Sequence, residues 1–163
     1  LHRTKPSVRT SRASASMRLR WDEGNVTTLP QVDLATLEKI APGDLRLLWV
    51  NDWDDGPLEA VVEHAGDPCL MVLYGEDASA ERPYRWLVIR LDPAQRADEE
   101  RWHSLFVEHV GDHWCFHDSS VAHPPRSASE PDREAFLREL RARPALDLRE
   151  APVVGWADEM PAA

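Results

Sequence analysis

The chain has 163 residues and a formal net charge of −10, from 29 acidic and 19 basic side chains. This length predicts one domain with tails, large enough to bury a real core. There is no run of about 18 apolar residues, so no transmembrane helix is predicted and no membrane partner is expected. The two cysteines, Cys69 and Cys115, do not make a disulfide framework. No apolar secretory segment lies near the start, so we expect a cytoplasmic location.

The charge is divided unevenly along the chain. Residues 1–20 carry six basic and no acidic side chains, and the other 143 residues carry 13 basic and 29 acidic ones, a net charge of −16. Such an acidic body should repel nucleic acid, because nucleic-acid binding depends on neutralising phosphates. It should attract a basic protein partner, although the same charge also serves solubility.

The composition changes along the chain and predicts its organisation. Residues 1–20 are rich in Ser and Arg and lack a hydrophobic period, which predicts a disordered basic tail. Ordered patterning begins just after Met17, which favours Met17 as the native start and residues 1–16 as non-native. After the tail we expect a core domain over 21–117, a Pro/Ser-rich linker over 118–130, a C-terminal helix and short strand over 131–156, and a frayed end over 157–163.

The first half of the core is dominated by strand signals. A short helix capped by Asp33 and ended by Pro42-Gly43 comes first. Four runs of strand length follow, at residues 45–50, 58–64, 69–74 and 84–91. Sequential strands joined by turns most simply form an antiparallel meander. We therefore predict an α+β fold, an antiparallel four-stranded meander with helices packed on one face.

The turn between the first two predicted strands holds the candidate partner-binding residues, which are Asp52, Trp53, Asp54 and Asp55. A tryptophan among carboxylates is typical of an interaction hot spot, and the alternative is that this ring folds back over the sheet edge. The oxygen-rich turn also suits a calcium or magnesium ion, but it lacks the glutamate that completes an EF-hand loop.

The clearest helix signal begins at Asp92-Pro93 and ends at Gly111. Asp92 is a good N-cap, Pro93 fits the first turn and glycine is typical just after a helix. Residues at spacings of three and four form one apolar stripe, comprising Trp102, Leu105, Phe106, Val110 and, in part, His109. Glu99 falls outside this stripe, so we expect it to face solvent.

A histidine cluster follows, since five of the seven histidines lie between His103 and His123. His109, His113, Cys115 and His117 offer nitrogen and sulfur ligands suited to zinc. The alternative is an ordinary half-buried helix end. Gly111 interrupts the helical spacing of His109 and His113, and the pattern matches no closed zinc template. The preferred prediction is no cofactor, with zinc as the alternative.

Two stretches carry a resemblance. The turn Trp53-Asp54-Asp55-Gly56-Pro57-Leu58 and the helix end Glu100-x-x-His103-x-x-Phe106-x-x-x-Val110-Gly111-x-His113 resemble a group of short, uncharacterised bacterial proteins. The similarity covers about residues 45–117 and leaves both tails unmatched. A bacterial origin also suits a chain that prefers Arg to Lys. The group implies no activity, catalytic residue or cofactor.

Two functions follow from these patterns. The first is a non-enzymatic protein-interaction domain of the immunity or regulatory type, binding a basic partner. It is favoured because the chain has no phosphate-cradling glycine loop, nucleophile elbow or H-E-x-x-H pattern. The alternative is a small metal-dependent hydrolase that uses the His103–His117 cluster as ligands or general base.

Overall fold

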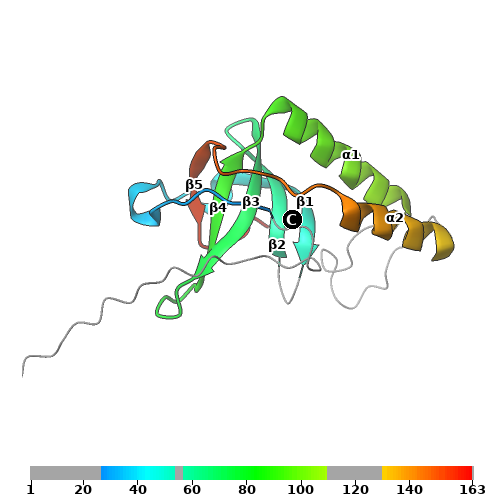
Figure 1. The fold of residues 1–163 in the computed structure, drawn as a ribbon. Helices are drawn as coiled ribbons and strands as arrows, with labels where there is room; N and C mark the ends of the chain where they lie inside the picture. Colours follow the sequence, from blue (N-terminus) through cyan, green and yellow to red (C-terminus); the bar gives the residue numbers. More distant parts are fainter. Residues whose placement is uncertain (1–26, 54–56, 110–129, 163) are drawn as a thin grey trace, which may run out of the picture.

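The computed structural model describes residues 27–53, 57–109 and 130–162. The predicted basic tail, the turn residues Asp54 and Asp55, and most of the predicted linker lie outside these ranges. The described chain forms one antiparallel sheet with the strand order β1-β2-β3-β4-β5 and two helices (Figure 1). The strands are β1 Leu45–Trp53, β2 Pro57–His64, β3 Asp67–Glu76, β4 Tyr84–Arg90 and β5 Val153–Ala157, and the helices are α1 Pro93–His109 and α2 Glu130–Ala142.

The predicted α+β class and antiparallel meander are confirmed, but the sheet has five strands rather than four. β5 pairs with β4 from Trp86↔Ala157 to Ile89↔Val153, with a register shift between Val88 and Ile89. In the sequence this strand is a five-residue segment interrupted by Gly155. Such a segment carries too few alternating positions to predict pairing, so long-range contacts decide that it joins the sheet.

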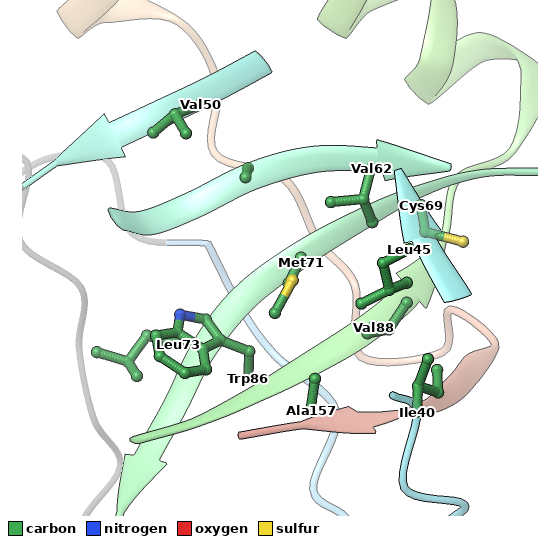
Figure 2. Close-up of a cluster of buried hydrophobic side chains, with 11 residues drawn as sticks. Ile40, Leu45, Val50, Val62, Cys69, Met71, Leu73, Trp86, Val88 and Ala157 are labelled. Carbon is green, nitrogen blue, oxygen red and sulfur yellow. The ribbon is translucent and has the colours of Figure 1, made fainter. Parts of the chain in front are cut away.

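The chain also links the two edges of the sheet. Residues 38–40 lie along β5, where Ile40 N donates to the Trp156 carbonyl at 2.8 Å and Trp156 N donates to the Glu38 carbonyl at 3.0 Å. A 3-10 turn, Pro42–Asp44, then leads directly into β1 at the opposite edge. The sheet therefore curls, and its strands surround an inner cluster of side chains (Figure 2).

The inner cluster follows from the alternation of side chains along each strand, which sends every second residue to the same face. Val62, Met71 and Val88, one from each central strand, are fully buried there. Their neighbours Val61, Leu70 and Leu87 point to the opposite, outer face and are equally buried. Both faces of the sheet are thus covered.

Irregular segments, rather than helices, cover most of the outer face. Thr28 and residues 146–148 pair there, because Thr28 N donates to the Leu146 carbonyl at 2.9 Å and Leu148 N to the Thr28 carbonyl at 2.8 Å. Leu148 is fully buried against β2, β3 and β4 side chains, and Leu34 and Leu37 pack on the same cluster. This cover brings the start of the described chain beside the segment that follows α2.

The predicted short helix near Asp33 is wrong in extent. Asp33 does act as a cap, accepting from Ala35 N at 3.0 Å, but only a 3-10 turn, Leu34–Thr36, follows it. Residues 38–40 are extended because their backbone pairs with β5. Leu34 and Leu37 lie on the outer face, while Ile40 enters the inner cluster, so the three side chains do not share one helical face.

The predicted start of the long helix is confirmed. Asp92 Oδ1 accepts from the N–H groups of Ala94 and Gln95, both at 2.8 Å, and Gln95 Oε1 accepts from Asp92 N at 2.9 Å. This reciprocal capping satisfies donors that a helix start leaves without partners. α1 lies alongside α2 (Figure 1), with the rings of Trp102 and Phe136 6.1 Å apart. No helix in the described ranges has the length and apolar character needed to cross a membrane.

The frayed end predicted from residue 157 onward is wrong for residues 157–160. Ala157 is fully buried in the inner cluster and Met160 packs against it. Between them, Asp158 forms an ion pair of 2.6 Å with Lys39 Nζ. Residues 157–160 are held against the core because they end and continue β5, a relation that the terminal sequence does not reveal.

Candidate functional site

A cavity of about 140 Å³ lies where the far end of β1 meets α1 and the segment that follows α2. Its walls combine carboxylates, aromatic rings, an imidazole and a guanidinium, from Glu59, Glu99, Trp102, Phe106, His103 and Arg143. These side chains come from β2, from one face of α1 and from the end of α2. The cavity therefore exists only in the folded chain.

Glu99 is the most deeply placed charged group, with 1% of its surface exposed. Asn51 Nδ2 donates to Glu99 Oε2 at 2.8 Å and to Glu59 Oε1 at 2.9 Å. One amide NH₂ thus holds two carboxylates. Trp49 Nε1 donates to Asn51 Oδ1 at 2.9 Å, which orients this amide and distinguishes its oxygen from its nitrogen.

The expectation that Glu99 faces solvent is wrong. Glu99 lies three, four and seven residues before Trp102, His103 and Phe106, so all four share one face of α1. That spacing was visible in the sequence. A helix face defined by its apolar residues alone leaves out a carboxylate, so the apolar stripe did not predict that Glu99 is buried.

Arg143 supplies the positive charge of the cavity. Its guanidinium forms an ion pair with Glu99 Oε1, and Nη2 lies 3.0 Å from Asp98 Oδ2. The guanidinium carbon also lies 5.7 Å from the centre of the Trp102 ring. Arg143 directly follows the last residue of α2, so this contact fastens the end of α2 to α1.

His103 forms another wall. Its imidazole stacks on the Trp49 ring, with ring centres 4.5 Å apart and planes 12° apart. The stack joins α1 to β1 and fixes the orientation of the imidazole. Among the described residues that line the cavity, Glu59 and Glu99 are the acidic side chains and Arg143 is the basic one, which also pairs with Asp98. With the imidazole neutral, the local charge is negative and favours a cationic guest.

The predicted partner-binding residues begin directly after the cavity residue Asn51. Asp52 and Trp53 end β1, where Asp52 pairs with Glu59 and Trp53 with Pro57 through the backbone. Asp54 and Asp55 lie outside the described residues. The backbone pairing shows that the start of the predicted binding turn is adjacent to the cavity.

The structure describes one of the four predicted metal ligands. His109 lies in the last turn of α1 and stacks on Phe136, with ring centres 5.2 Å apart. Its Nδ1 is buried without a hydrogen-bond partner among the described residues. His113, Cys115 and His117 lie outside those residues. In the part of the chain that is described, no three His, Cys, Asp or Glu side chains are placed to hold a metal ion together.

Cys69 offers no reactive thiol. It is fully buried in the inner cluster, and burial raises the pKa of its thiol to about 11. A thiol with that pKa stays protonated near neutral pH, and the thiolate is the nucleophilic form. Cys69 is therefore a core residue.

Comparisons with known protein families, with curated proteins and with solved structures find no match for this chain.

Proposed function

We propose that this chain is a non-enzymatic interaction domain of the cytoplasm, of the immunity or regulatory type, which binds a basic protein partner. In this proposal the cavity receives a cationic side chain of the partner. The observation that carries it is the pair of carboxylates, Glu59 and Glu99, that Asn51 holds together in the wall of a partly enclosed cavity.

Electrostatics support a cationic guest. Among the described residues, two carboxylates and one guanidinium line this partly enclosed cavity, so its wall carries a negative charge where charge interactions are stronger than in bulk solvent. The Trp102 ring adds an aromatic face to which a cation is attracted. The negative charge of the whole chain would speed the approach of a basic partner.

The size of the cavity limits the guest to the end of one side chain. Its volume of about 140 Å³ is close to the roughly 150 Å³ of an engineered cavity that binds benzene. Pockets for drug-sized ligands or cofactors are typically about 300–1,000 Å³. The rest of the contact would come from the surface around the cavity, and the adjoining turn of Asp52, Trp53, Asp54 and Asp55 is the proposed source.

A Glu59→Gln variant tests this function. Removing one charge from the cavity should weaken binding of a short peptide rich in Arg and Lys by about tenfold, because a hydrogen bond to a charged group is worth ~1.5–3 kcal/mol. The measurement is isothermal titration calorimetry on the full chain, at low and at higher salt. Binding should also weaken as salt is added.

Glu63→Gln is the matched control. Glu63 lies on the same strand as Glu59 but pairs with Arg46 at the surface, away from the cavity. The Glu63→Gln variant should bind the peptide as tightly as the unchanged chain does, and circular dichroism should show that both variants are folded. No binding at low salt, or equal weakening by the two substitutions, would contradict the proposal.

A second candidate, the metal-dependent hydrolase, is supported by one feature of the cavity. His103, Glu59 and Glu99 together could act as acid and base on a bound substrate. Elemental analysis and native mass spectrometry of the untagged chain test it. One zinc per chain, lost in His113→Ala, would favour the hydrolase, and a chain that takes up no zinc would rule it out.

A further inference from the structure

We infer that the basic partner binds by adding an extended segment to the sheet beside β1. The basic character of the partner rests on the proposed function, and the edge of β1 is a second contact surface that does not depend on the cavity. The pairing of the strands, the side chains along β1 and the charges around that strand all favour this mode of binding.

The two edges of the sheet differ in how they are covered. At one edge, the backbone of β5 pairs further with residues 38–40, through the bridge between Lys39 and Trp156. At the other edge, β1 pairs with β2, and no other segment of the described chain pairs with its backbone. Every second residue of an edge strand directs its N–H and C=O groups away from the neighbouring strand, so an added strand can bond to them.

Apolar side chains flank this edge on both faces of the sheet. Leu47 packs against the inner cluster, Leu48 and Trp49 pack against the cluster on the outer face, and all three are only partly buried. An added strand sends its alternate side chains to the two faces, where they would cover the apolar surface that is left exposed. The edge of β1 therefore offers backbone hydrogen bonds and apolar contacts together.

Irregularities in β1 limit the length of the added segment. The register of β1 with β2 shifts between Leu47 and Trp49 and again between Val50 and Asp52. Bulges of this kind twist an edge strand and restrict the length over which another strand can pair with it. They favour a short segment of one partner over open-ended association of many chains.

The charges around β1 favour a basic segment. Four acidic residues lie at the ends of the strand or follow it in the sequence: Asp44, Asp52, Asp54 and Asp55. Arg46, the one basic residue within β1, is already bonded to Glu63. A segment with apolar residues at its centre and basic residues at its ends matches this arrangement. A second copy of the chain would bring its own net charge of −10, which opposes such pairing.

Two peptides of identical side chains and charge provide the test. The first is a short peptide with alternating valines at its centre and lysines at both ends. The second has the same sequence with methylated backbone nitrogens, so it cannot donate hydrogen bonds to β1. Calorimetry on the full chain should show binding about tenfold weaker for the methylated peptide, since each lost hydrogen bond is worth roughly 1 kcal/mol. In NMR, the first peptide should slow hydrogen exchange of β1 amides and leave β3, which already pairs on both sides, unchanged.

Equal affinity of the two peptides, or no slowing of exchange in β1 when the first peptide is saturating, would overturn the inference. So would failure of the first peptide to bind where the peptide rich in Arg and Lys does bind. In these cases the interaction domain stands and strand addition fails. If none of the basic peptides binds at low salt, the proposed function fails as well.

Discussion

At the scale of single residues, Glu99 is a carboxylate that the fold buries almost completely. Burying a carboxylate costs roughly several kcal/mol of stability, unless an opposite charge and hydrogen bonds offset this cost. Here Arg143 supplies the charge and Asn51 a hydrogen bond, from segments far away in the sequence. The pair therefore has two effects. It joins β1, α1 and the end of α2, and it places a negative group in the cavity.

Arg143→Ala should lower the free energy of unfolding by about 3 kcal/mol, because it leaves Glu99 buried without its main counter-charge. The double variant Arg143→Ala with Glu99→Gln should lose less stability than Arg143→Ala alone, because no buried negative charge is left to be compensated. Urea denaturation followed by circular dichroism measures both.

Arg149→Ala is the control for that comparison. Arg149 pairs with Asp147 where both side chains are largely exposed, so its loss should leave the denaturation midpoint nearly unchanged. If Arg143→Ala lowered the free energy of unfolding no more than Arg149→Ala does, the contact between Arg143 and Glu99 would not stabilise the fold.

At the scale of elements, the contact between residues 38–40 and β5 completes the sheet. Gly155 permits it, because a Cβ built there would lie 2.6 Å from the Glu38 carbonyl oxygen and 2.9 Å from Ile40 side-chain carbons. The absence of a side chain lets two backbones approach closely, and Ile40 then reaches the inner cluster. Local propensity alone would disfavour glycine in a strand.

Gly155→Ala should therefore destabilise the fold by about 2 kcal/mol, the usual cost of forcing extra atoms into a packed core. Gly75→Ala is the matched control, since Gly75 also lies in a strand and its added Cβ would meet nothing within 4 Å. Thermal unfolding of both variants gives the comparison. Equal melting temperatures would show that residues 38–40 are not held tightly against β5.

At the scale of the whole molecule, ion pairs connect segments that lie far apart in sequence. Asp158, after β5, contacts Lys39 at 2.6 Å and Arg82 at 3.8 Å, and so links three separate segments. The Lys39 hydrogen bond, with smaller help from Arg82, holds the pKa of Asp158 below its ordinary value of 3.8. Because the folded-state pKa is lowered, this contact stabilises the fold above that ordinary value and loses its effect as pH falls through the folded-state pKa.

Asp158→Asn should consequently lower stability near neutral pH by about 0.5 kcal/mol, a small amount because the side chains of Lys39 and Arg82 are about half exposed and their charges are screened by solvent. The difference from the unchanged chain should shrink as pH falls below the ordinary value of 3.8 and through the lowered folded-state pKa, where the native carboxylate becomes protonated. Melting temperatures measured across this range provide the check. A difference that persists at the acid end would point to lost packing rather than lost charge.

Local chemistry alone determined part of this protein. The apolar runs predicted four of the strands, because each run buries its residues on a pleated surface and turn residues separate it from the next. Asp33 and Asp92 were predicted as caps, because a cap is a contact between near neighbours in the chain. The acidic charge, and with it the proposed basic partner, also follows from composition.

Tertiary structure decided the rest. Residues 38–40 are extended, the short strand predicted near the C-terminus joins the sheet beside β4 and Glu99 is buried, each because of a partner more than 40 positions away. The cavity likewise depends on Asn51, Glu99 and Arg143, which no local pattern connects. Spacing within one segment reports which residues share a face, but it does not report what that face meets. Only the folded chain placed a buried carboxylate, an amide and a guanidinium around one small cavity.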